Sequence, residues 1–213
     1  WAVRIRVACP SVQVHGLLAA APCDGGQDGA GFATDAGPIR ARYLVAADGL
    51  RSPLRKAAGL EGRPSRRRRL ALRRHYAVAP WSDVVEVYWS DGAEAYVTPI
   101  GGDQVGVAML FEGSRPDFDR LLERFPGLAR RIGSAPVTSR PRGAGPLERL
   151  TATVVRGDLA LVGDAAGYVD AITGEGLAIA FYDAVALVES IERGRGLSLF
   201  AAARRRQARL PEG

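Results

Sequence analysis

The stretch that decides the fold is GDLALVGDAAGYVDAITGEGLAIAF, residues 157–181. An apolar run over Leu159–Gly163 is followed by small residues and glycines, and a long apolar segment begins at Gly176. This order predicts a buried strand, a glycine-rich turn and then a helix. The repeated glycines have two explanations: a tight packing turn, or a turn that leaves its backbone open to a ligand.

The polar residues of this turn favour a ligand. Asp164 follows the predicted strand at its carboxyl end, where ligands bind in open α/β sheets, and its carboxylate can accept hydrogen bonds from a ribose diol. Ala165 is small, so a bulky ligand can approach the backbone. Gly174, Glu175 and Gly176 lead into the helix, whose first amides lack partners and carry partial positive charge. The stretch therefore predicts a site for a nucleotide-type cofactor with a redox ring.

A second stretch, LVAADGLRSPLR at residues 44–55, repeats this arrangement. A short apolar strand ends at Asp48–Gly49, and Ser52 and Pro53 are typical of the N-cap and first position of a helix. Arg51 and Arg55 add positive charge. Alone, the pattern indicates only a strand, a turn and a helix, but together with the first stretch it supports a nucleotide site.

The two stretches resemble known flavoprotein motifs. Residues 41–60, ARYLVAADGLRSPLRKAAGL, resemble the DG motif of the FAD-dependent aromatic-hydroxylase class, and residues 157–181 resemble its GD motif. Residues 86–110 resemble the aromatic-then-proline strand segment of the geranylgeranyl-reductase-like branch, which includes halogenase relatives. The resemblance covers most of residues 40–193.

The resemblance implies an FAD cofactor, with NAD(P)H as the electron donor. It places the GD motif near the ribose and pyrophosphate, the start of the long helix near the flavin pyrimidine edge, and the DG motif in support of the cofactor. The implied cofactor-binding residues are Asp48, Gly49, Arg51, Arg55, Gly163, Asp164, Ala165, Gly174, Glu175 and Gly176.

One feature of these proteins is absent from the sequence. They share an N-terminal G-x-G-x-x-G turn that holds the ADP part of the cofactor. The segment GGQDGAG, residues 25–31, is rich in glycine, but no helix pattern follows it. We therefore expect a C-terminal portion of a flavoprotein, and we expect the isolated chain to bind FAD weakly or not at all.

The middle of the chain has a different pattern. Four short alternating runs between residues 63 and 110 predict a mostly antiparallel sheet, and an amphipathic helix interrupted at Pro126 follows. The predicted fold class is α/β with an α+β insert, namely part of a Rossmann-like FAD-binding domain with an inserted substrate domain. The expected domains are 1–62, a partial FAD-binding domain; 63–150, the substrate-type sheet; and 151–213, the return to the FAD-binding domain.

Composition excludes several classes of protein. The 213 residues are 47% hydrophobic and 24% charged, which suits a globular chain. No apolar run is long enough to span a membrane, and no signal-peptide pattern is present. The two cysteines form neither a disulfide framework nor a metal site. We expect a cytoplasmic protein without a metal.

The net charge is +6, and an arginine cluster runs from Arg63 to Arg74. Such a cluster can bind nucleic acid or an anionic membrane. Because no aromatic residues are interleaved with the cluster, we expect a solvated basic face. We expect no stable membrane insertion, and any membrane contact through the cluster would be peripheral. The expected partner is a small-molecule substrate, and no nucleic acid is expected.

The predicted function is an FAD-binding oxidoreductase, a flavin monooxygenase acting on an aromatic or polyketide-like molecule. The alternatives are a flavin reductase of isoprenoid double bonds and a non-enzymatic basic binding module. The sequence offers no catalytic residue. His75, Tyr88, Trp89 and Tyr96 either line a pocket or pack within the sheet, and the sequence leaves both readings open.

Overall fold

The computed structural model describes residues 14–16, 31–34, 37–63, 69–114, 116–168 and 174–207. Most of GGQDGAG and Arg66–Arg68 of the arginine cluster lie outside these ranges. The chain forms two compact units. Unit 1 comprises Trp1–Pro64 and Arg149–Gly213, and unit 2 comprises Ser65–Glu148.

Unit 1 contains two small sheets. In the first, strand order is β10-β11-β4; β11 pairs in parallel with β4 and antiparallel with β10. The second is antiparallel, in the order β1-β2-β3. The strands are β1 (Val14–Gly16), β2 (Gly31–Thr34), β3 (Gly37–Arg40), β4 (Leu44–Ala46), β10 (Val155–Arg156) and β11 (Leu159–Leu161).

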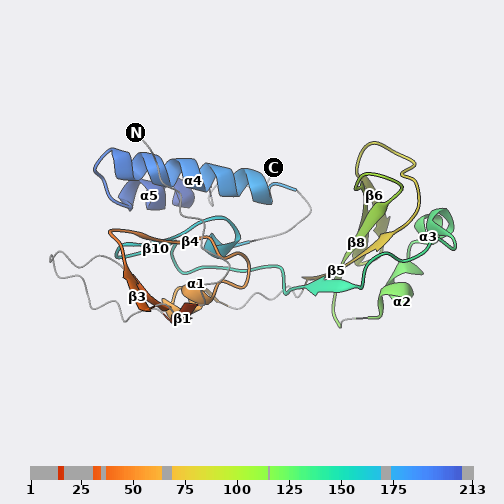
Figure 1. Cartoon of the computed structure of the whole chain (residues 1–213), viewed down its shortest axis with the longest axis horizontal. Helices are drawn as coiled ribbons and strands as arrows, with labels where there is room; N and C mark the ends of the chain where they lie inside the picture. Colours follow the sequence, from red (N-terminus) through yellow and green to blue (C-terminus); the bar gives the residue numbers. More distant parts are fainter. Residues whose placement is uncertain are drawn as a thin grey trace. The chain divides into compact units, whose positions relative to one another are not determined.

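Alternation along β11 shows that the first sheet has helices on both faces. Leu159 and Leu161 pack with the strand β4 residues and with Leu60, which follows α1 (Pro53–Ala57). Ala160 packs instead with residues of α4 (Gly176–Glu192) and α5 (Ser198–Gln207). Figure 1 shows α4 and α5 side by side, next to β4 and β10. The sheet is therefore the middle layer of an α/β/α sandwich, as the α/β prediction requires.

The outer face of α4 is apolar and exposed. Leu177, Phe181 and Val185 recur at helical spacing and are 74%, 69% and 59% exposed. A helix that is apolar on every side is typical of a fully buried element. Among the described residues, however, nothing packs against the outer face of α4. None of the helices in the described ranges is both long and apolar enough to cross a membrane.

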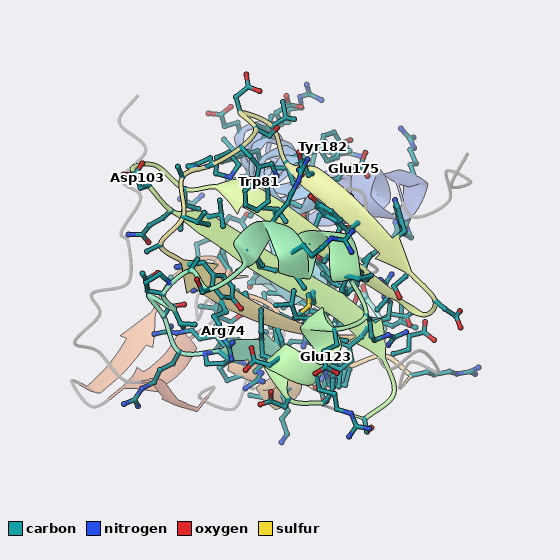
Figure 2. The ribbon with its side chains drawn as sticks, turned by 90° about the vertical axis from the view of Figure 1, so that its right-hand side faces the viewer. Arg74, Trp81, Asp103, Glu123, Glu175 and Tyr182 are labelled. Atoms are coloured by element: carbon teal, nitrogen blue, oxygen red, sulfur yellow. The ribbon has the colours of Figure 1, made fainter. Side chains whose placement is uncertain are left out.

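Unit 2 is a five-stranded antiparallel sheet in the order β6-β7-β8-β5-β9. Its strands are β5 (Arg69–Tyr76), β6 (Glu86–Ser90), β7 (Ala93–Pro99), β8 (Val105–Glu112) and β9 (Arg142–Ala144). The predicted interrupted helix is confirmed as α2 (Phe118–Leu122) and α3 (Pro126–Ile132). These two helices, green in Figure 2, lie over one face of the sheet, and their apolar residues form a core with it.

Tyr88 and Trp89 are neighbours on β6, and they lie on opposite faces of the sheet. Tyr88 packs against the core beneath α2 and α3, whereas its neighbour Trp89 is 66% exposed. Because successive residues of a strand point to opposite faces, Tyr88 and Trp89 cannot line the same pocket. Tyr88 thus packs within the sheet, which is one of the two readings that the sequence left open. The opposite face, which carries Trp89, is called the open face below.

Candidate functional site

The first corner of the candidate site lies between β4 and α1. Ser52 is the N-cap of α1 as predicted, and its Oγ accepts a hydrogen bond from the Arg55 amide at 2.9 Å. The Asp48 Oδ2 accepts another from the Leu54 amide at 3.1 Å. Gly49 has a φ of 78°, a left-handed conformation that favours glycine. The turn thus holds an exposed carboxylate, that of Asp48, beside the start of a short helix.

The second corner follows β11. The strand was expected to reach Gly163 but ends at Leu161, because Gly163 has a φ of 56° and starts the 3₁₀ helix η1 (Gly163–Ala166). Asp164 therefore lies in a helical turn rather than in a loop. Its side chain is only partly exposed, and burial raises the pKa of the Asp164 carboxyl. Ala165, in contrast, is fully buried and can offer a ligand only its backbone.

Arg55 joins the two corners. Its side chain is 2% exposed, and one guanidinium nitrogen donates to the carbonyl oxygens of Ala165 at 3.0 Å and of Asp164 at 3.4 Å. The other donates to the Leu50 carbonyl at 2.8 Å. Arg55 was predicted to contact the cofactor; its observed contacts are with the protein backbone. Arg51, by contrast, is exposed and free of such backbone contacts within the described residues.

Asp183 fixes the second corner from the far side, and the sequence analysis missed it. The carboxylate is fully buried in α4; its Oδ2 accepts a hydrogen bond from the Gly163 amide at 2.8 Å, and its Oδ1 lies 3.3 Å from Arg204 Nε. Burial raises the pKa of Asp183, and Arg204 and the Gly163 amide oppose that shift. The signal in the sequence was an acidic residue in the middle of an apolar run, GLAIAFYDAVALV at residues 176–188.

The start of α4 completes the site. Gly174 has a φ of 66° and is exposed, as is Glu175, the N-cap, which makes no side-chain capping bond. A Cβ built on Gly176 would lie 3.6 Å from Tyr168 Cε2 and 3.9 Å from Asp164 Oδ1. The structure thus brings the Asp164 carboxylate next to the uncapped start of a 17-residue helix. Thr173, at the same corner, lies outside the described residues.

This arrangement fits a flavin nucleotide. A partly exposed carboxylate can accept hydrogen bonds from hydroxyl groups, and the uncapped helix start offers amides to an anion or to an electron-rich ring. Gly176 adds no side chain of its own next to Asp164. The structure brings Gly163, Asp164, Ala165 and Gly174–Gly176 together, and Arg55 ties them to the corner of Asp48 and Gly49.

A second polar cluster lies in unit 2, where Glu86 accepts hydrogen bonds from Trp81, Tyr88 and Arg131. These hydrogen bonds, the one from Trp81 first, lower the pKa of Glu86. An adjoining surface hollow of about 470 Å³ is lined by Tyr88, Gly127, Arg130 and Arg131. The four polar groups satisfy one another, so the cluster ties β6 to α3.

The arginines of the cluster that the structure describes have different contacts within unit 2. Arg69 forms an ion pair with the buried Glu94 at 2.5 Å, and Arg74 forms one with Asp119 at 2.5 Å. Arg73, in contrast, contacts only His75 among the described side chains. Carboxylates of unit 2 therefore hold Arg69 and Arg74, whereas Arg73 is exposed.

Comparisons with known proteins identify the fold. The solved structures similar to the chain include CmlS, a flavin-dependent halogenase, with a TM-score of 0.78 and 17% identity over 93% of this chain and 39% of that one. The flavin-dependent brominase Bmp2, solved as a triple mutant, has a TM-score of 0.72 and 19% identity over 86% of this chain and 51% of that one. PqsL of Pseudomonas aeruginosa, a probable FAD-dependent monooxygenase, has a TM-score of 0.62 and 22% identity over 92% of this chain and 58% of that one.

These similarities show a shared fold, and the chain spans between 39% and 58% of the length of these three proteins. No curated protein matches the chain by sequence. The model of the family described as "FAD binding domain" matches residues 31–193, which is well over half of the chain. This match confirms the family expected from the DG and GD motifs: the chain belongs to the FAD binding domain family.

Proposed function

We propose that the chain is the flavin-holding portion of an FAD-dependent monooxygenase that is reduced by NAD(P)H and acts on an aromatic or polyketide-like small molecule. The family match and the flavin-dependent enzymes among the similar structures support the FAD-dependent oxidoreductase. The observation that carries the proposal is the partly exposed Asp164 carboxylate beside the bare start of α4.

Bound FAD would supply the electron-transfer chemistry, and the protein would supply position and electrostatics. In this proposal Asp164 accepts hydrogen bonds from the ribose hydroxyls, and the first amides of α4 stabilise negative charge on the flavin ring. Gly174 and Gly176 let the ring approach the backbone. Arg55 and Asp183 act through the backbone, because they hold the Gly163–Ala165 turn in place.

Two substitutions test this corner by FAD titration, followed through flavin fluorescence. Asp164→Asn removes the negative charge but keeps the shape, and we expect FAD affinity to fall at least tenfold. The melting temperature should not fall, because the carboxylate is paired with no cation among the described residues and burial disfavours its charged form. Asp103→Asn in unit 2 is the matched control and should keep the FAD affinity of the wild type.

Gly176→Ala separates a ligand role from a packing role. The added Cβ would make only ordinary contacts, and replacing glycine by alanine where the backbone allows it stabilises a chain by about 0.4–1 kcal/mol, chiefly through the unfolded state. We therefore expect a chain that is equally or more stable but binds FAD several-fold more weakly, since the methyl group lies next to Asp164. Unchanged affinity in both variants would remove this corner from the flavin site.

Oxygen consumption tests the monooxygenase assignment. In a protein that joins this chain to a G-x-G-x-x-G unit, with FAD bound and NADH or NADPH supplied, we expect oxygen uptake that rises when a suitable aromatic or polyketide-like compound is added. The measurement uses an oxygen electrode, with nicotinamide oxidation followed in parallel. Substrate-dependent nicotinamide oxidation that needs no oxygen, together with saturation of an isoprenoid double bond, would instead establish the reductase.

A further inference from the structure

The open face of the five-stranded sheet carries a row of five residues, one on each strand. Strand register pairs Val87 with Tyr96, Tyr96 with Ala108, Ala108 with Arg73, and Arg73 with Arg142. Directly paired residues point to the same face, and neighbouring strands are about 4.8 Å apart. The row therefore changes, across the sheet, from an apolar end to a cationic end.

At the cationic end of the row, two positive charges lie next to each other, which is unfavourable in the absence of a bound anion. Arg73 and Arg142 are both exposed and directly opposite each other, and like charges in that position destabilise a sheet. No carboxylate within the described ranges forms an ion pair with either arginine. Glu94, a buried carboxylate of the same face, is already paired with Arg69. The two guanidinium groups thus lack compensating negative charge among these residues.

His75 contacts one of these arginines. Its Nε2 lies 2.6 Å from Arg73 Nη1. Because His75 comes two residues after Arg73 on β5, it lies on the same face, one row along the strand.

The other end of the row suits an aromatic ring. Tyr96 is half-buried, and the exposed Val87 lies beside it. Ala108 separates Tyr96 from Arg73 and carries only a methyl group, so it is the smallest side chain of the row. Two strand spacings, about 10 Å, separate the backbones of Tyr96 and Arg73. A small aromatic acid spans such a distance with its carboxylate on the arginines.

We propose that this row binds an aromatic carboxylate, whose acid group lies on Arg73 and Arg142 and whose ring lies over Ala108 against Tyr96. This inference rests on the proposed function, because it names the class of substrate that the flavin enzyme would take. Charge complementarity selects the anion: it would relieve the repulsion between the two arginines and form charge-assisted hydrogen bonds with both.

The test titrates the 213-residue chain with three probes and follows the amide NMR signals of unit 2. Benzoate has both ring and charge, benzamide has the ring alone, and acetate has the charge alone. We expect benzoate to bind at least fivefold more tightly than either of the others, with the largest shifts at Arg73, Tyr96 and Ala108.

Arg73→Gln and Arg142→Gln should each remove the preference for benzoate over benzamide. Both should also keep or raise the melting temperature, since each relieves the like-charge pair. Arg130→Gln changes an exposed arginine on α3, against the opposite face, and should leave benzoate binding as in the wild type.

Equal binding of benzoate and benzamide, or benzoate binding that survives Arg73→Gln, would overturn the inference. So would an equal loss in Arg130→Gln, since that result means only general attraction to a basic protein. FAD titration distinguishes failure of this inference from failure of the proposed function. If FAD binds at the Asp164 corner but benzoate shows no preference, only this inference fails. If benzoate binds with its preference but Asp164→Asn and Gly176→Ala leave FAD binding unchanged, the proposed flavin corner fails.

Discussion

Replacing Asp183 by alanine is expected to lower the free energy of unfolding by about 3–5 kcal/mol, the usual cost of removing one partner of a buried ion pair. The substitution leaves the buried Gly163 amide without its acceptor and Arg204 without this carboxylate. Because Gly163 begins the turn that presents Asp164, FAD affinity should fall as well. Urea denaturation followed by circular dichroism measures the stability.

The matched control for Asp183 is on the same helix. Glu189 forms an exposed pair with Arg193 one helical turn away, and exposed pairs of this kind contribute about 0.3–0.5 kcal/mol. Glu189→Ala should therefore change stability by less than about 1 kcal/mol. A double-mutant cycle between Asp183 and Arg204 isolates their coupling. If Asp183→Ala costs no more than Glu189→Ala, Asp183 does not anchor the turn.

Replacing Arg55 by alanine is the second change with a large expected effect. Three backbone carbonyls, of Leu50, Asp164 and Ala165, would lose their donor. An unsatisfied buried group costs about 1–3 kcal/mol, which applies in full only to Ala165, because the contacts to Leu50 and Asp164 are only partly buried. We expect a loss of about 2–4 kcal/mol in the free energy of unfolding and a fall of at least tenfold in FAD affinity. Chemical denaturation and flavin fluorescence measure the two quantities.

Arg51→Ala shows which role Arg55 has. Arg51 lies four residues earlier in the same motif and is exposed, so its loss should change stability by less than about 0.5 kcal/mol. If Arg55 acts by positioning, Arg55→Ala loses stability and FAD affinity together, and Arg55→Lys restores part of both. Loss of FAD affinity with unchanged stability would instead make Arg55 a direct cofactor contact.

Local sequence patterns predicted the elements around the candidate site well. The cap at Ser52 and the proline at position 53 set the start of α1, and apolar alternation gave β5 to β8. Small residues after a buried strand indicated the turn at Asp164. In each case the physical cause lies within a few neighbouring residues, so a single sequence is sufficient.

Other features depend on pairing between distant segments, and the sequence alone could not supply it. The contact between Asp183 and Gly163 needs the packing of α4 against η1, and the role of Arg55 needs the two corners to meet. The separation of Tyr88 from Trp89 follows from the strand alternation, but which of them faces the helices depends on the fold. The opposition of Arg73 and Arg142 depends on the register of β5 and β9.

The most direct test of the flavin site is an amide NMR titration of the chain with FAD. Even weak binding shifts the signals of residues that contact the ligand. We predict that the largest shifts occur in three segments: Asp48–Arg51, Gly163–Ala166 and Gly174–Leu177. Shifts confined to other residues, or none in these segments at FAD concentrations that perturb the rest of the chain, would contradict the account.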